Sequence, residues 1–256
     1  MEYFVRKDSI VRTIWSKGDT ILFIFAGAAA EFALNKAVDW LYFTGKLPAD
    51  PLGRLFSTVN YARQIVFSEE EKALAAIDKI TLIHKAVEAN RGDTIPDWAY
   101  RDVLYMLIHY SIASFELLEK KLDSEEKEEI YNVFYRMGNR MGLKDLPMNF
   151  RLWIEDRQQH LENDLKRSAL TKDLFKQYRK HLGLVRYSIL VEGQKLVIPP
   201  VVRNLLNLNM PSLAYPLLKI YKASKTIKID NWLRDIILPV KYQKEIKNLD
   251  EPYLSA

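Results

Sequence analysis

Apolar residues recur three and four positions apart along most of this chain, which is the spacing of helices that bury one face. Glycine and proline, which interrupt helices, number only 9 and 10 among 256 residues. No internal repeat and no low-complexity stretch breaks the pattern. The chain is therefore predicted to be an all-α protein whose core is an antiparallel helical bundle over residues 19–183.

Capping and turn residues divide this core into separate helices. The first, over residues 19–42, is apolar on all sides in its first half and is expected to lie at the centre. Asp50 is expected to cap a second helix over 51–67. Ser68 and Glu71 form a capping-box pattern that opens a third helix, ending near residue 90. Similar start signals predict helices from 97 to 122, 124 to 138, 150 to 165 and 171 to 183.

The pattern changes after residue 185. Two short apolar runs, 188–191 and 196–198, flank Glu192-Gly193-Gln194 and predict a small β-hairpin near 188–198. Residues 199–256 contain several prolines and are expected to form short helices and extended connectors that wrap the bundle. Their apolar residues are too few for an independent core. We therefore expect a single domain over 1–256, with a core bundle at 19–183 and a C-terminal extension at 184–256.

The chain contains no cysteine, which excludes disulfides, thiolate nucleophiles, iron–sulfur clusters and thioether-linked haem. The absence of cysteine also fits a reducing compartment. The first 13 residues lack the apolar core of a signal peptide, and the most apolar run, 21–30, is too short for a bilayer span. A soluble, cytoplasmic protein is expected.

The net charge of +5 is unevenly distributed. Residues 166–256 contain 17 Lys and Arg against 7 Asp and Glu, whereas the preceding part is acidic. A basic segment of this kind can meet phosphate on nucleic acid or on an anionic lipid surface. Because the lysines are scattered, a solvated basic surface is the simpler interpretation. Nucleic acid is not expected as a partner, and weak contact with a membrane surface stays open.

Several familiar catalytic motifs are absent, including the glycine-rich nucleotide loops, the G-x-S-x-G elbow and the H-E-x-x-H zinc motif. No histidine follows a glutamate by three residues, so the E-x-x-H pattern of di-iron bundles is missing too. The histidines are His84, His109, His160 and His181. In an all-α protein, inward-facing histidines leave haem open as a cofactor.

Two of the histidines are expected to face inward. His84 continues the third helix's apolar stripe, and His109 shares one face of the next helix with Tyr105 and Ile112. Antiparallel packing of these helices would bring both imidazoles toward one interior at comparable heights. His160 and His181 lie in charged surroundings and are expected at the surface. From the residues alone, a hydrogen-bonded core histidine is the simpler explanation of His84.

Arg54 and Thr58 are four positions apart on the second helix, so a guanidinium and a hydroxyl would share one face. They could stabilise negative charge on dioxygen at a haem iron, or hold a haem propionate. A solvated helix face explains the same residues equally well.

These helices also carry a resemblance. The sequence is similar to the bacterial and fungal family that contains the rubber oxygenase called latex-clearing protein and the mycophenolic-acid-pathway oxygenase. In that family a helix reading Asp-Pro-x-x-Arg-x-x-x-Thr, ending near Val-Phe, precedes a helix reading Ile-His-x-x-Val. The matching positions here are Asp50, Pro51, Arg54, Thr58, Val66, Phe67, Ile83, His84 and Val87.

The resemblance implies an all-α, haem b-dependent oxygenase that activates O2 toward a small apolar substrate. It implies His84 as the axial iron ligand, Arg54 and Thr58 as catalytic residues of the distal pocket, and His109 as a pocket wall or second partner of the haem. The chain departs from the family at Ser57, where the rubber oxygenase has a lysine that can ligate the iron. It also lacks the His-Pro and Asp of many members, at 29–33 and 111–114. A six-coordinate resting iron is therefore not implied.

Two other functions remain open from the sequence. The chain could be a non-catalytic helical protein that keeps the family scaffold and binds an apolar ligand, or a membrane-surface protein that uses its basic C-terminal third. The substrate, the redox partner and the oligomeric state are not predicted.

Overall fold

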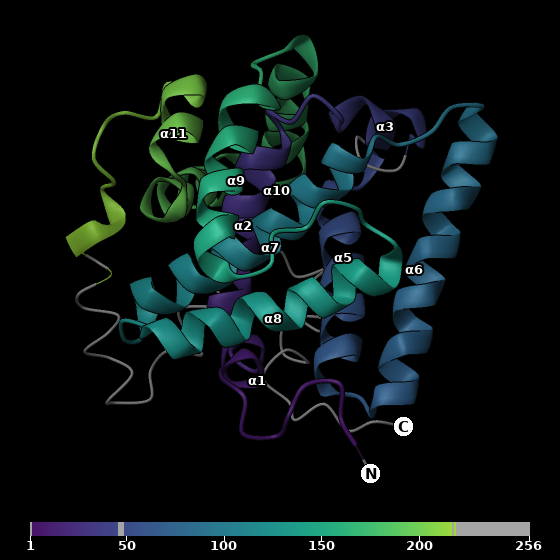
Figure 1. Ribbon diagram of the computed structural model, residues 1–256. Coiled ribbons are helices and arrows are strands. Elements are labelled where there is room, and N and C mark those ends of the chain that lie inside the picture. The colour runs from purple at the N-terminus through teal and green to yellow at the C-terminus, as the bar shows by residue number, and fades with distance from the viewer. Residues whose placement is uncertain (1, 46–48, 217, 219–256) are drawn as a thin grey trace.

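Helices make up the regular structure of this protein (Figure 1). The computed structural model describes residues 2–45, 49–216 and 218. Within these residues the only strand-like features are two isolated β-bridges, Tyr3 with Glu69 and Asn35 with Leu165. The predicted all-α fold is confirmed.

The helices follow one another through short connections. Their bounds are α1 (Ile10–Trp15), α2 (Gly18–Phe32), α3 (Val38–Phe43), α5 (Pro51–Phe67), α6 (Glu70–Arg91), α7 (Asp97–Leu118), α8 (Ser124–Met141), α9 (Phe150–Asn163), α10 (Ala169–Val197) and α11 (Pro200–Leu206). Among the residues that the structure describes, no helix is long and apolar enough to cross a membrane.

The pair formed by α2 and α7 is the centre of the bundle. The two helices run antiparallel, because Asn35 just beyond α2 bonds Asp102 near the start of α7, whereas Gly27 touches Tyr110 further along. Helix α10 packs on both members of the pair, and α8 and α9 pack on α7. Helices α5 and α6 lie side by side at one edge of the molecule (Figure 1).

Local capping signals placed several helix ends correctly. Asp50 accepts a hydrogen bond from the Gly53 N–H and begins α5 at Pro51. Asp123 and Glu126 form a reciprocal capping box at α8. Gly92 ends α6 in the left-handed conformation, at φ 69°, which glycine adopts without a Cβ penalty. The capping box expected at Ser68 is wrong, because Ser68 ends α5, and Glu69 precedes α6 without a side-chain cap.

The long first helix expected over 19–42 is two helices. Helix α2 ends at Phe32 and α3 begins at Val38, with a turn around Asn35 between them. The Asn35 side chain accepts from the Ala37 N–H and donates to Asp102, so it competes with the helical pattern. Apolar periodicity alone could not reveal this break.

The β-hairpin expected near 188–198 is wrong. These residues complete α10, which runs from Ala169 to Val197 with a kink at Gly183, where φ is 73°. Within this part of the helix the apolar Val197 and the polar Gln194 are buried. Short apolar runs cannot distinguish a buried strand from a helix segment. The expected C-terminal wrap falls mainly on 219–256, outside the described residues, and the single-domain organisation stays a prediction.

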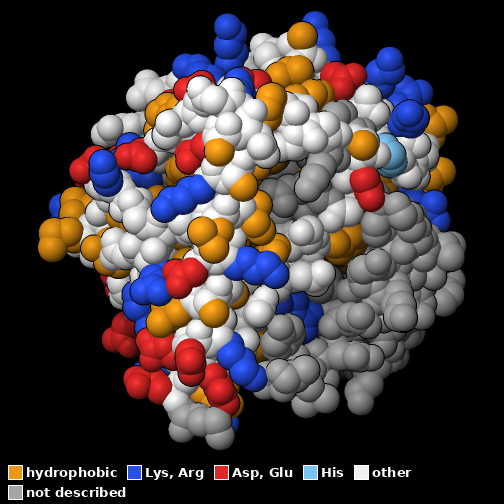
Figure 2. All heavy atoms as spheres, turned by 90° about the vertical axis from the view of Figure 1, so that its right-hand side faces the viewer, with side chains coloured by type: hydrophobic (Ala, Val, Ile, Leu, Met, Phe, Trp, Pro, Cys, Tyr) orange, Lys and Arg blue, Asp and Glu red, His pale blue; other side chains and the backbone are white. Residues whose placement is uncertain are grey.

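Charged and apolar side chains are interspersed on the α5–α6 side of the molecule. Figure 2 shows acidic side chains gathered at the lower left of this face, with basic side chains among them and scattered above them. The described part of this face therefore carries no large surface of a single sign of charge.

Close packing of α2 against α7 predicts a strong effect of one glycine substitution. A Cβ at Gly27 would overlap Cδ1 and Cε1 of Tyr110, which is itself fully buried. Gly27→Ala should therefore lower the free energy of unfolding by about 1–3 kcal/mol. Gly193→Ala is the matched control, since its Cβ would meet Phe23 at an ordinary 3.6 Å. Denaturant unfolding measures both, and equal stability of the two variants would contradict the packing argument.

Candidate functional site

The α5–α6 pair carries the first group of expected site residues. The side chain of Arg54 lies outside the described residues, although its backbone belongs to α5. Thr58 is half-buried on the same helix. A groove of about 430 Å³ runs along the pair. It is lined by Gly53, Phe56, Ser57, Asn60, Tyr61, Gln64 and Lys79.

This groove follows the face of α5 that carries Ser57 rather than the neighbouring Thr58. Its lining combines the aromatic rings of Phe56 and Tyr61 with hydroxyl, amide and ammonium groups. The groove can therefore accept an apolar body with polar substituents.

His84 lies where α6 meets the start of α7. Its ring is half-buried and its centroid is 5.1 Å from that of Tyr100. The Tyr100 hydroxyl donates to Glu88 at 3.2 Å, and burial together with this carboxylate raises the pKa of Tyr100. On the face of α6 that carries His84, Ala73 and Ile77 are buried, whereas His84 is half-buried. This face therefore becomes more exposed to solvent toward His84.

His109 occupies a different environment, inside the packing of α7 against α10. The residue is half-buried by area, but its Nε2 atom is fully buried and has no hydrogen-bond partner among the described residues. Burial, assisted by the nearby Arg157 cation, lowers the pKa of His109 to about 4, and a hydrogen bond to the Val197 backbone opposes this shift. The imidazole is therefore neutral at pH 7.

The two imidazoles do not meet on one interior face. His84 packs against Tyr100, and His109 lies nine positions further along α7. At 3.6 residues per turn, nine positions are two and a half turns, so Tyr100 and His109 point to opposite sides of α7, about 14 Å apart along its axis. The expected convergence of His84 and His109 is therefore wrong. Each histidine faces a different set of helices.

A buried ion pair that the sequence did not predict joins three helices near His109. Glu31 of α2 is fully buried, and its Oε2 accepts from Arg157 of α9 at 2.5 Å and from the Tyr110 hydroxyl of α7 at 2.8 Å. Burial and the Glu31 charge raise the pKa of Tyr110. Burial opposes the charged form of Arg157, but the Glu31 carboxylate outweighs it and raises the pKa of that guanidinium. The only sequence signal was Glu31 itself, a charge on an apolar helix.

The remaining histidines differ from each other. His181 is exposed on α10, as expected. His160 was expected at the surface but is buried at 7% exposure, between α9 and α7. The surface was expected because His160 has charged neighbours in the sequence. Two of these neighbours, Asp156 and Asp164, lie four positions before and after His160, and their carboxylates face its ring.

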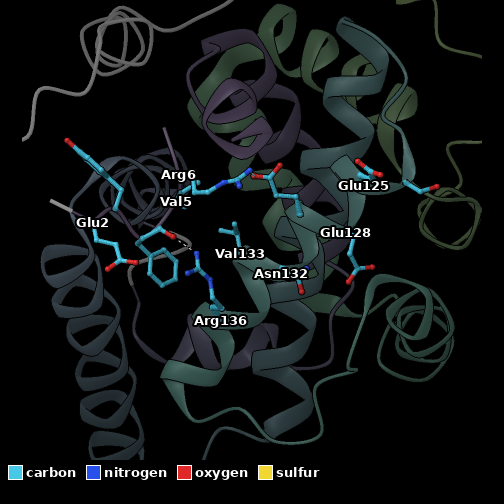
Figure 3. Close-up of a pocket in the computed structure, with 12 residues that line it drawn as sticks. Glu2, Val5, Arg6, Glu125, Glu128, Asn132, Val133 and Arg136 are labelled. Atoms are coloured by element: carbon cyan, nitrogen blue, oxygen red, sulfur yellow. Dashed lines mark hydrogen bonds and ion pairs between the residues drawn. The ribbon is translucent and has the colours of Figure 1, made fainter. Parts of the chain in front are cut away.

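A larger groove, of about 700 Å³, lies between the N-terminal residues 2–6 and α8 (Figure 3). Arg136 closes one side of the groove, where its guanidinium donates a hydrogen bond to the Phe4 carbonyl. The Arg136 Cζ atom lies 4.4 Å from the centroid of the Phe4 ring. Acidic side chains, among them Glu125 and Glu128, line the α8 side. This groove contains none of the expected site residues.

Helical bundles as a group can hold cofactors or metals between their helices, through side chains such as imidazoles. The chain belongs to the family of the ER-bound oxygenase mpaB/B'/rubber oxygenase catalytic domain, whose model matches residues 15–228. The match spans α2 to α11 and includes every expected site residue. The family resemblance is therefore confirmed. No curated protein matches the chain.

The side chains present fit a haem iron in kind. A ligating imidazole must be neutral, and a hydrogen bond on one ring nitrogen commonly orients the other toward the metal. His109 meets both conditions, with a depressed pKa and a buried, unpartnered Nε2. His84 offers a half-buried imidazole on α6, against the ring of Tyr100, and does not line the groove along α5.

The depressed pKa of His109 predicts a pH-dependent stability. The ordinary value of 6.5 applies to the unfolded chain, which therefore takes up a proton on acidification before the folded protein does. Stability is fully present above pH 6.5 and is lost as the pH falls toward about 4, by at most about 3 kcal/mol. In haem-free protein, His109→Gln should remove this part of the pH dependence.

Denaturant unfolding between pH 4 and 7.5 measures the effect. His181→Gln is the control, because His181 is exposed. Identical pH profiles for the wild type and His109→Gln would contradict the assignment.

Proposed function

We propose that this protein is a haem b-dependent oxygenase that activates O2 toward a small apolar substrate, with His84 as the axial ligand. The observation that carries the proposal is membership of an oxygenase catalytic-domain family over residues 15–228. The second helix of the family motif, which reads Ile-His-x-x-Val, includes His84. We propose that the His84 imidazole supplies the nitrogen donor that haem iron requires.

The surroundings of His84 support the assignment. Its ring is half-buried, so a planar cofactor could reach it without unfolding the bundle. The neighbouring Val87 and Tyr100 offer apolar and aromatic surface. The Tyr100–Glu88 hydrogen bond fixes the ring against which His84 packs, so it would orient the imidazole.

Residues of α5 would complete the site. Arg54, with a fixed positive charge, would hold a propionate or another anionic group, and the Thr58 hydroxyl would donate a hydrogen bond on the same helix face. Ser57 lines the groove and brings a neutral hydroxyl where the rubber oxygenase has a lysine. Bound haem would supply the electron transfer and oxygen chemistry, which no side chain of this chain provides. The Phe56 and Tyr61 rings in the groove would contact an apolar substrate, and the polar groups beside them would orient it.

The ligand assignment predicts a specific loss of haem. The experiment is to express the protein in cells supplied with a haem precursor and to record its absorption spectrum. The wild type should show a Soret band, and His84→Ala should lose it, because iron bound by a single imidazole cannot keep that bond after its removal. His181→Ala should retain the band, since His181 is exposed on α10.

His109→Ala distinguishes the two inward imidazoles. It should retain most of the Soret absorbance, and loss of the band in His109→Ala with retention in His84→Ala would move the ligand to α7. A wild-type protein that takes up no haem under any reconstitution would overturn the proposal and favour a non-catalytic ligand-binding protein of this scaffold.

Arg54 predicts a graded effect on haem binding. Arg54→Ala should weaken haem affinity about tenfold or more, because a charge-assisted hydrogen bond contributes roughly 1.5–3 kcal/mol. Arg54→Lys keeps the charge and should recover part of the affinity. Haem titration followed at the Soret band measures both. Wild-type affinity in Arg54→Ala would show that the guanidinium does not contact the haem.

A further inference from the structure

We propose that Asp102, His160 and Asp164 form a binding site for a divalent transition-metal ion, and that Zn²⁺ is the ion that suits it best. The site joins α7 to the end of α9 and does not depend on the haem proposal. One ligand atom from each of the three side chains lies within 4.8 Å of the other two. The side chains are 2%, 8% and 17% exposed in the order Asp102, His160, Asp164.

The donor atoms converge on one point. His160 Nδ1 is 2.5 Å from Asp102 Oδ1 and 3.1 Å from Asp164 Oδ2. An imidazole nitrogen carries at most one hydrogen, so it cannot fully satisfy two carboxylates. A cation at this point would be shared by all three groups, after small adjustments of the side chains.

The charge balance also favours a cation. A third carboxylate, Asp156, lies 3.8 Å from His160 Nε2 and accepts a hydrogen bond from Tyr105 at 2.5 Å. Three carboxylates thus surround one imidazole, which can carry at most one positive charge. Among the described residues no lysine or arginine lies within ion-pair distance of these carboxylates. Arg157 acts on Asp102, and Lys36 and Arg101 act on Asp164, only from further away. Buried charge that is only partly compensated is costly, and a divalent ion would offset it.

The surrounding structure holds the ligands in place. Asn35 donates to Asp102 Oδ2 at 2.5 Å, which leaves Oδ1 toward His160. The Asn35 amide is itself fixed by accepting from the Ala37 N–H. Backbone bonds between the segments 34–36 and 164–166 anchor the chain beside Asp164. Outer contacts of this kind orient metal ligands and strengthen binding.

The donor set indicates the class of metal. One imidazole nitrogen with two carboxylate oxygens suits first-row transition ions better than Mg²⁺ or Ca²⁺, which prefer all-oxygen sites. Among common ions Zn²⁺ combines high affinity with tolerance of a compact, four-coordinate geometry. Because the three ligands are mostly closed off from solvent, the ion would hold α9 against α7.

Zinc binding by the haem-free 256-residue protein tests the proposal. After removal of metals with a chelator, calorimetric titration with Zn²⁺ should show one site per chain, and Zn²⁺ should raise the melting temperature. His160→Ala should abolish this binding, and His181→Ala should bind as the wild type does. Asn35→Ala should weaken binding about 10–100-fold, as expected for loss of an outer contact to a ligand.

Two results would overturn the site: no stoichiometric Zn²⁺ binding by the wild type, or undiminished binding by His160→Ala, which would indicate adventitious surface zinc. Should His160→Ala fail to fold, Co²⁺ titration of the wild type replaces it. One equivalent of Co²⁺ should give a saturable visible spectrum that Zn²⁺ abolishes, and a featureless titration would equally overturn the proposal.

Discussion

The burial of a single carboxylate constrains how this bundle assembles. Glu31 sits on the most apolar helix of the chain, fully removed from solvent. An unpaired charge there would cost several kcal/mol, so α2 can be buried only where Arg157 and Tyr110 reach Glu31. These partners belong to α9 and α7. The ion pair therefore fixes three helices relative to one another, and the contact of Gly27 with Tyr110 brings α2 and α7 close enough for it to form.

This central packing gives α7 two chemically different sides. One side carries Tyr100, which meets His84 and Glu88 of α6 at the edge of the bundle. The other carries Asp102 and His109, which lie in the buried polar region with α2, α9 and α10. A helix with apolar residues on nearly all sides can present functional groups in two directions, because each polar group is satisfied by a different neighbour.

The proposed haem site near His84 and the proposed metal site at Asp102, His160 and Asp164 differ in their exposure to solvent. The α5–α6 pair is peripheral, half-buried toward His84 and grooved along α5, which suits a bulky cofactor and a substrate that must enter and leave. The Asp102–His160–Asp164 group is closed in by helix packing, which suits an ion with a structural role. The structural role rests on this burial and not on the number of ligands, because three protein ligands leave one position of a four-coordinate zinc open.

The sequence by itself determined those features that depend on near neighbours. Helical periodicity predicted the all-α fold, and the Asp50 cap marked the start of α5, because a side chain satisfies backbone N–H groups two or three positions away. The motif around Arg54, Thr58 and His84 carried the family resemblance, which the match over residues 15–228 confirms.

Only the tertiary structure decided which distant residues meet. The pairing of Glu31 with Arg157, 126 positions away, and the burial of His160 beside Asp102 depend on the angles at which helices pack, and local sequence does not encode them. The same holds for the turn at Asn35, where a side-chain bond to α7 overrides apolar periodicity. His84 and His109 were separated for this reason too. A helix's rotation about its axis is set by its neighbours, so a histidine's position along the chain does not determine which cavity it faces.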